Sequence, residues 1–391
     1  MLEYFPTNYV WNLSTNIAFM MGGNYGEIDA ICRQLVEASK SGDDAGTVAF
    51  FNVWCEQADR LVALANEDLI AGRRLSAGSK FGRAATYYIT AERMQSRRFE
   101  PRRRAYQNML DCFAKYVEYA AQNCERVEIP YQGKSLAGLF VRAHRTDASA
   151  APCIAFFNGL DSTKEMIYGS RIGHELARRG ISTLMVDQPG VGEALRLNDL
   201  RAIVEAEVWA GACADVLVCR PDVDSDYLGV CAWSLGGYFA PRAAAFDKRF
   251  KLCVAWGANF NWGELQKRRA AREGDRPVPH YWEHVQWVWG QESFDEFMAF
   301  APRVTLEHCT DQITVPLLIT HGANDRQIPK EYAIQQFDRA INSPKRELKW
   351  FTAREGGVEH TSADNPENAK DYIADWIAAT FRELGAHGVT T

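Results

Sequence analysis

The sequence predicts an α/β fold in which an all-helical N-terminal domain precedes a mostly parallel sheet of about eight strands. Up to about residue 124, apolar residues recur every three or four positions, the spacing of helices that bury one face. Beyond it, short apolar runs alternate with helical stretches, which is typical of a parallel sheet with helices on both faces. Between residues 256 and 315 this alternation stops and aromatic residues become frequent, which indicates an insertion.

We expect four segments from these changes. They are a helical domain (1–124), the first part of an α/β core (125–260), a lid insertion (261–312) and the second part of the core (313–391). The predicted strands cover residues 126–131 and 136–141, which form a hairpin, then 153–158, 182–187, 228–232, 252–256, 315–321 and 347–351. The predicted helices cover residues 28–38, 47–71, 76–88 with Ser76 as its cap, 104–121, 172–179 and 201–218.

Composition narrows the classes of partner. The 391 residues carry a formal net charge of −6, which gives no reason to expect nucleic acid or an anionic membrane surface. The N-terminus lacks the pattern of a signal peptide, and no apolar run reaches the ~18 residues of a membrane span. The ten cysteines form no C-x-x-C pair, which favours reduced thiols and a cytoplasmic protein. We expect no cofactor and no metal, because His280 and His284 share a helical spacing but lack an evident third ligand.

Residues 229–240 carry the strongest chemical signal. An apolar strand-like run ends at Ser234, and small residues then lead into an alanine-rich helix. A strand, a tight turn and a helix form the setting of a nucleophile elbow, in which a serine hydroxyl is exposed at the top of a sheet. Crowding at such a turn requires small residues two positions before and after the serine, and these are Ala232 and Gly236. Alanine replaces the usual first glycine, so the surrounding sequence must support the assignment.

Two later loops supply the partners that a serine nucleophile needs. A hydroxyl is a weak nucleophile unless a base takes its proton and a third group orients that base. Asp325 lies in a Gly/Asn-rich loop after the strand at 315–321, and His360 lies in a glycine-bearing loop after the last strand. The chain order Ser, Asp, His at strand ends predicts a catalytic triad of Ser234, Asp325 and His360.

An acyl-transfer enzyme also needs amide donors for the oxyanion. We expect one from Leu235, the residue after the nucleophile. The other is expected from the loop after the strand at 153–158, with Leu160 preferred and Gly159 or Asp161 as alternatives.

Two features near these loops have structural interpretations. Asp161 and Lys164 lie in and just after the predicted oxyanion loop. They either pair and shape this loop or act as ordinary capping residues at the start of a helix, and capping is the favoured interpretation. Residues 187–193 contain G-x-G, but the third glycine and the acidic residue of a dinucleotide site are missing. This segment therefore predicts a tight turn at the top of the sheet.

Residues 158–165 (NGLDSTKE), 187–193 (DQPGVGE) and 232–237 (AWSLGG) together resemble one branch of the α/β-hydrolases. That branch contains 2,6-dihydroxypseudooxynicotine hydrolase, fungal hydrolases that shorten polyketide pigment precursors, and FrsA-like esterases. The resemblance implies a helical part packed on a hydrolase core, a site between them and often a homodimer. It also implies cleavage of a carbon–carbon bond next to a ketone, with an acidic residue after the strand that follows the elbow. Glu264 is near that position.

The resemblance and the aromatic lid predict a small aromatic or polyketide-like substrate. Candidate substrate contacts besides Glu264 are Trp233, Tyr87, Tyr88, Trp262 and Trp287, because aromatic rings suit a flat ligand. A carboxylesterase, lactonase, thioesterase or acyltransferase with the same triad is the alternative. A binding protein on a hydrolase scaffold is the remaining hypothesis.

Overall fold

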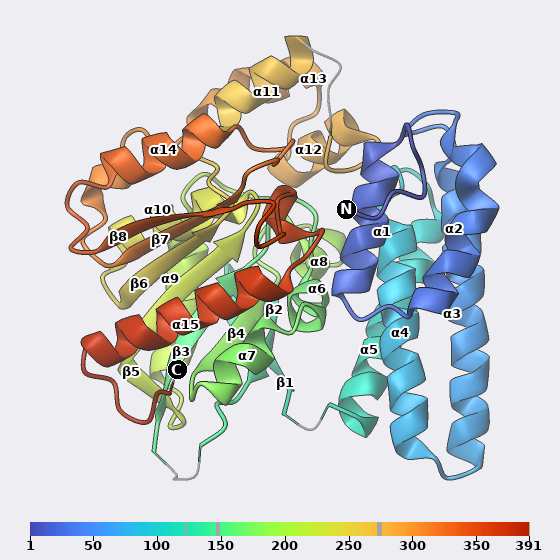
Figure 1. The fold of residues 1–391 in the computed structure, drawn as a ribbon, viewed down its shortest axis with the longest axis horizontal. Helices are drawn as coiled ribbons and strands as arrows, with labels where there is room; N and C mark the ends of the chain where they lie inside the picture. The colour runs from blue at the N-terminus through green and yellow to red at the C-terminus, as the bar shows by residue number, and fades with distance from the viewer. Residues whose placement is uncertain (122, 146–148, 272–275, 391) are drawn as a thin grey trace. The chain divides into compact units, whose positions relative to one another are not determined.

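The computed structural model describes residues 1–121, 123–145, 149–271 and 276–390 (Figure 1). The chain divides into two compact units. One contains residues 1–124 and 275–284, and the other contains residues 125–274 and 285–391. Part of the predicted lid insertion therefore groups with the N-terminal helices, and its residues 272–275 lie outside the described residues.

The N-terminal unit is helical, as the apolar spacing predicts. Its core contains many aromatic rings, and Phe50 packs against both Trp11 and Trp54. The predicted cap at Ser76 is wrong, because α4 already begins at Arg74 and no side chain caps it. The helices are α1 (Tyr9–Met20), α2 (Tyr25–Ser39), α3 (Thr47–Ile70), α4 (Arg74–Arg93) and α5 (Pro101–Tyr119).

The second unit is built on an eight-stranded sheet with the order β1-β2-β4-β3-β5-β6-β7-β8. The pairs β1/β2 and β2/β4 are antiparallel, and all the other pairs are parallel. The strands are β1 (Glu125–Tyr131), β2 (Lys134–Val141), β3 (Ala151–Phe157), β4 (Ser182–Val186), β5 (Val223–Trp233), β6 (Phe250–Trp256), β7 (Leu317–Gly322) and β8 (Arg346–Phe351).

Helices bury both faces of this sheet. Every residue of β3 and β4 is buried, as expected for central strands covered on two sides. In Figure 1, α7 and α15 lie together on one face, and α9 and α10 cover the other. The helices are α6 (Lys164–Gly169), α7 (Ile172–Arg178), α8 (Gly192–Arg196), α9 (Ala206–Val218), α10 (Gly236–Phe246), α14 (Lys330–Arg339) and α15 (Glu367–Glu383).

The segment between β6 and β7 contains three α-helices among its described residues. They are α11 (Trp262–Ala271), α12 (Tyr281–Trp289) and α13 (Phe294–Phe300). The end of α12 also explains one wrong boundary. The helix predicted to start at residue 201 starts at Ala206 instead, because the amide of Ala202 donates to Val288 O and Arg201 Nη1 donates to Trp287 O. No described helix is both long enough and apolar enough to span a bilayer.

Candidate active site

Ser234 occupies a sharp turn between β5 and α10. Its φ of +58° lies in the left-handed region, which costs a non-glycine residue roughly 1–3 kcal/mol and is common at functional sites. The turn is crowded, as predicted: a Cβ added to Gly236 would lie 2.5 Å from the Cβ of Ala232. The Ser234 amide donates to Trp256 O at 2.9 Å, which ties the turn to β6.

The structure brings Ser234, His360 and Asp325 together although they are far apart in the sequence. His360 Nε2 lies 2.8 Å from Ser234 Oγ. His360 Nδ1 lies 2.9 Å from Asp325 Oδ2 and 3.1 Å from Asp325 Oδ1. The two ring nitrogens are thus engaged on opposite sides, one with a hydroxyl and the other with a carboxylate. This geometry allows the imidazole to take a proton from Ser234 while Asp325 orients the ring.

The Asp325 carboxylate is buried but well supplied with donors. Its Oδ1 accepts the backbone amides of Gln327 at 2.7 Å and Ile328 at 3.0 Å. Burial alone would raise the pKa of Asp325, but His360, with smaller contributions from His321 and the Ile328 amide, lowers it below its usual value. Asp325 is therefore held as an anion beside the imidazole.

A short, strained loop carries His360. Thr361 and Ser362 have φ values of +50° and +59°, so two successive residues after the histidine are in the left-handed region. Asp364 stabilises the loop, since its carboxylate accepts the amides of Gly357, Val358 and Glu359. This loop fixes the direction in which His360 projects.

The loop after β3 passes directly against the serine. A Cβ added to Gly159 would lie 2.8 Å from Ser234 Cβ and 3.1 Å from Ser234 Oγ, so only glycine fits without a shift. Leu160 follows Gly159, and Leu235 follows Ser234, so both predicted oxyanion donors belong to segments next to the hydroxyl. The Gly159 amide donates to Ser162 Oγ at 3.2 Å and is therefore engaged within its own loop. The identity of the second oxyanion donor stays a prediction.

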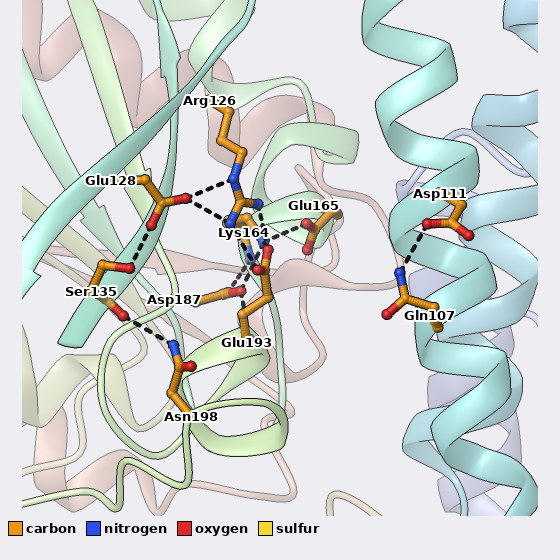
Figure 2. Close-up of polar contacts among 10 residues, drawn as sticks. All are labelled: Gln107, Asp111, Arg126, Glu128, Ser135, Lys164, Glu165, Asp187, Glu193 and Asn198. Carbon is orange, nitrogen blue, oxygen red and sulfur yellow. Dashed lines mark hydrogen bonds and ion pairs between the residues drawn. The ribbon is translucent and has the colours of Figure 1, made fainter.

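Beside this loop lies a group of charges that the sequence does not predict, four of them buried and the fifth, Arg126, half-exposed (Figure 2). Lys164 Nζ pairs with Glu165 Oε1 at 2.6 Å, Asp187 Oδ2 at 3.0 Å and Glu193 Oε1 at 2.6 Å. Arg126 makes a two-pronged contact with Glu193, at 2.6 and 2.8 Å. We call these five residues the Lys164 cluster. It joins residues 158–165 to residues 187–193, whereas the sequence offered a pair of Lys164 with Asp161 only as one of two alternatives.

Burial and neighbouring charges shift the pKa values of the residues in the Lys164 cluster in different directions. Burial alone would lower the pKa of Lys164, but Asp187, Glu165 and Glu193 raise it above its usual value. Burial likewise opposes ionisation of Glu193, yet Arg126 and Lys164 lower its pKa to about 2. Burial raises the pKa of Glu165. The three carboxylates offer oxygens within 4.8 Å of one another, a spacing that could hold a metal ion, but the Lys164 ammonium pairs with all three.

Two of the three predicted aromatic contacts in the second unit, Trp233 and Trp262, are buried in packing, and Trp287 is half-buried. Trp233 is 4% exposed, its ring packs on Phe156 and Trp256, and its indole N–H donates to Ser162 Oγ at 2.9 Å. Trp262 is 2% exposed and packs against Trp289 and Phe297. The ring of Trp287 lies near the Arg196 guanidinium, 5.8 Å from the ring centre. These contacts favour a structural role for Trp233 and Trp262.

The other predicted contacts also have partners within their own units. Tyr87 donates to Glu27 Oε2 at 2.6 Å, and Tyr88 donates to Asp59, so both hydroxyls are used inside the helical unit. Glu264 is 43% exposed and lies near Lys267 and Arg268 on the surface of α11, at 3.9 and 3.7 Å. A substrate contact for any of these residues stays a prediction.

Two cavities lie away from Ser234, and none of the predicted site residues lines them. One, of about 890 Å³, is bordered by Glu125, Arg142, Arg220 and Asp222 near the starts of β1 and β5. The other, of about 490 Å³, includes Tyr227 and Lys345. Ligands of open α/β sheets bind outside the carboxyl ends of the strands. Ser234, Asp325 and His360 follow the carboxyl ends of their strands, and none of them lines either cavity.

Sequence reasoning missed Ser162, Asp187 and Glu193 as parts of the site's support. All three lie inside the motifs at 158–165 and 187–193, so the signal was present. What the motifs could not tell is which side chain of one meets which side chain of the other.

Comparisons with known proteins agree with this architecture. Residues 210–383 match the prolyl oligopeptidase family, Peptidase_S9. The hydrolyase poxO of Penicillium oxalicum is 30% identical over 391 aligned residues, which cover 88% of this chain and 91% of that protein. The α/β hydrolase gkaG of Penicillium citrinum is 33% identical over 238 residues, and the match covers 56% of this chain and about half (52%) of gkaG.

The 2,6-dihydropseudooxynicotine hydrolase of Paenarthrobacter nicotinovorans is 24% identical over 334 residues, covering 84% of both chains. The crystal structure of 2,6-dihydroxy-pseudo-oxynicotine hydrolase superposes with a TM-score of 0.76 at 20% identity, over 96% of this chain and 98% of that chain. That structure supports the fold over nearly the whole length. The chain therefore belongs to the α/β-hydrolase family, and its homologues include 2,6-dihydropseudooxynicotine hydrolase.

Proposed function

We propose that this α/β-hydrolase cleaves its substrate through an acyl-enzyme on Ser234. His360 takes the proton of Ser234 Oγ as the oxygen attacks a carbonyl carbon, and Asp325 orients the imidazole and stabilises its charged form. The amides of Leu235 and Leu160 hold the developing oxyanion. His360 then gives the proton to the leaving group, and water attacks the acyl-enzyme to release an acid.

One observation carries this proposal: the hydrogen-bonded line from Asp325 through His360 to Ser234. Its two links measure 2.9 and 2.8 Å, within the range of a nucleophile and base that can exchange a proton. The left-handed backbone of Ser234 and the passage of Gly159 beside its hydroxyl are further support.

We propose that the substrate is an aromatic or polyketide-like ketone and that the enzyme cleaves the carbon–carbon bond next to its carbonyl group. The support is the likeness to 2,6-dihydropseudooxynicotine hydrolase over 84% of the chain. Cleavage of such a bond expels a carbanion, which is a poor leaving group unless an adjoining phenol or second carbonyl delocalises its charge. His360 would supply the proton that this carbanion takes up.

Hydrolysis of a carboxylic ester, lactone or thioester, or acyl transfer to another acceptor, is the second candidate. The same nucleophile, base and oxyanion donors serve these reactions. Only the leaving group, and the access of water to the acyl-enzyme, separate them from carbon–carbon cleavage.

A substrate panel tests the proposal. Aryl ketones with an ortho-hydroxyl group and β-diketones are offered beside p-nitrophenyl esters, and acid products are measured by mass spectrometry. We expect acid release from the ketones, and Ser234→Ala should lower turnover on the order of 10³-fold or more while leaving the fold intact. Turnover of esters alone would favour the second candidate. Near-normal rates in folded Ser234→Ala would overturn the serine mechanism for both.

A further inference from the structure

One hydroxyl group ties the loop after β3 to the strand that carries Ser234. Ser162 Oγ accepts a hydrogen bond from Gly159 N at 3.2 Å and another from Trp233 Nε1 at 2.9 Å. It donates to Asn158 Oδ1 at 2.7 Å. A serine hydroxyl has one hydrogen and two lone pairs, so its hydrogen-bonding capacity is filled.

The surroundings make this hydroxyl difficult to replace. Ser162 is 7% exposed, Trp233 4% and Asn158 0%, so a lost bond would leave buried polar atoms without water to compensate. Asn158 extends the connection, because its Nδ2 donates to Val186 O at 2.8 Å at the end of β4. The side chains of Ser162 and Asn158 thus link the ends of three neighbouring strands, β3, β4 and β5.

The hydrogen bonds of Ser162 lie next to the residues that the proposed mechanism uses. Trp233 immediately precedes Ser234, and Gly159, the other donor to Ser162, contacts Ser234 and immediately precedes Leu160. The bond from Gly159 N to Ser162 Oγ fixes the Asn158–Gly159 peptide, which directly precedes the peptide that carries the Leu160 N–H. We propose that Ser162 is a positioning residue, with Trp233 as its anchor on β5, and that it sets the distance between the Leu160 amide and Ser234 Oγ. This inference rests on the proposed serine mechanism.

A positioning role of this kind acts on the transition state. Amide donors of an oxyanion hole stabilise charge that appears only as the carbonyl is attacked, and loss of one such donor costs about 10²–10³-fold in rate. A loop that is displaced but still present loses part of that effect. Substitutions that remove the hydrogen bonds of Ser162 or Trp233 should therefore lower the rate of the chemical step and leave ground-state binding nearly unchanged.

Labelling by a fluorophosphonate measures this without knowledge of the natural substrate, because its phosphonyl oxygen takes the oxyanion position when Ser234 attacks. Ser162→Ala should lower the maximal labelling rate about 10–100-fold, with half-saturation changed less than about threefold. Trp233→Phe keeps a ring but removes the N–H, and it should lower the same rate. The double variant should be less impaired than the product of the single effects, because both act through one hydrogen bond.

Ser170→Ala is the matched control. Ser170 is fully buried in the same unit, and its hydroxyl donates to Ile167 O at 2.7 Å and accepts the Ile172 amide at 3.4 Å. Its removal should destabilise the protein to a similar extent, measured by urea unfolding, without changing the labelling rate.

The outcomes separate this inference from the mechanism beneath it. No labelling of Ser234 in the unaltered protein would overturn the serine mechanism. Labelling of Ser234 with rates within threefold of the unaltered protein in both Ser162→Ala and Trp233→Phe would overturn the positioning role alone. If Ser162→Ala does not fold, Trp233→Phe decides. Equal losses of labelling rate in Ser162→Ala and Ser170→Ala would show a general effect of destabilisation and would also refute the role.

Discussion

Two buried aspartates at the carboxyl edge of the sheet are anchored alike and have different partners. Asp187 follows β4 and accepts the backbone amides of Lys164 and Glu193 together with the Lys164 ammonium. Asp325 follows β7 and accepts two backbone amides together with the His360 imidazole. Each carboxylate thus takes two amides and one side-chain donor.

The difference lies in what the side-chain donor can do next. Lys164 is surrounded by three carboxylates that raise its pKa, so it keeps its proton and serves as a fixed charge. His360 meets one carboxylate and presents its other nitrogen to Ser234, so it can take up and return a proton. A buried aspartate that accepts backbone amides therefore indicates no function by itself. The side-chain donor that it binds determines whether it stabilises the fold or takes part in the reaction.

Asp325→Asn should have the largest effect on catalysis. The amide can stabilise the wrong tautomer of His360 and cannot balance its positive charge, so kcat should fall by about 10³–10⁴-fold. Steady-state kinetics and urea unfolding of the same preparation test this. If kcat falls less than tenfold in folded protein, the proposed difference in role between Asp325 and Asp187 is contradicted.

Lys164→Met should have the largest effect on stability. It leaves Asp187, Glu165 and part of Glu193 without their cation in a buried site, which costs about 3–5 kcal/mol in the free energy of unfolding. Urea unfolding measures the loss. Lys267→Met is the control, because Lys267 is 56% exposed and its ion pair with Glu264 is long, at 3.9 Å. This substitution should change the free energy of unfolding by less than about 0.5 kcal/mol. Similar values for both variants would contradict a supporting role for the cluster.

The pH dependence of stability should contain the signature of Glu193. Its pKa of about 2 in the folded protein is below the ordinary value of 4.5, so its contribution is present above pH 4.5 and is lost as the pH falls toward 2. Glu193→Gln should lower the free energy of unfolding by about 1–3 kcal/mol at pH 7. The difference from the unaltered protein should shrink as the pH approaches 2.

Unfolding by urea at a series of pH values measures this difference. Glu383→Gln, at an exposed ion pair with Lys345, should give a curve parallel to that of the unaltered protein. A constant gap between Glu193→Gln and the unaltered protein from pH 7 to 2 would argue against the lowered pKa.

Glu264→Gln should have the smallest effect. Its carboxylate is partly exposed and pairs only loosely along α11, so stability should change by less than about 0.5 kcal/mol and kcat by less than about twofold. A large rise in KM with unchanged stability would instead support the substrate contact that the resemblance implies.

Local patterns were enough to predict the class of fold and to place Ser234, Asp325 and His360 in loops that follow strands. Apolar runs locate buried strands, and Ser234, Asp325 and His360 each follow such a run in a loop of small residues. Because parallel strands end at one edge of a sheet, order along the chain could be turned into proximity in space.

Contacts between side chains of different loops could not be predicted in this way. The sequence gives no means to choose Asp187 over Asp161 as a partner for Lys164, because that choice depends on how two loops approach across the sheet. Aromatic residues were equally ambiguous, since the same ring can line a site or fill a core. Trp233 and Trp262 are buried in packing, and nothing in residue type indicates this in advance.

The identity of the nucleophile is tested most directly by covalent labelling combined with peptide mass spectrometry. Protein is treated with increasing amounts of a fluorophosphonate, and modified peptides and remaining turnover are measured in the same samples. We predict one adduct per chain, located on Ser234, with turnover lost in proportion to the modified fraction. Full turnover in protein whose Ser234 is completely modified would contradict the account.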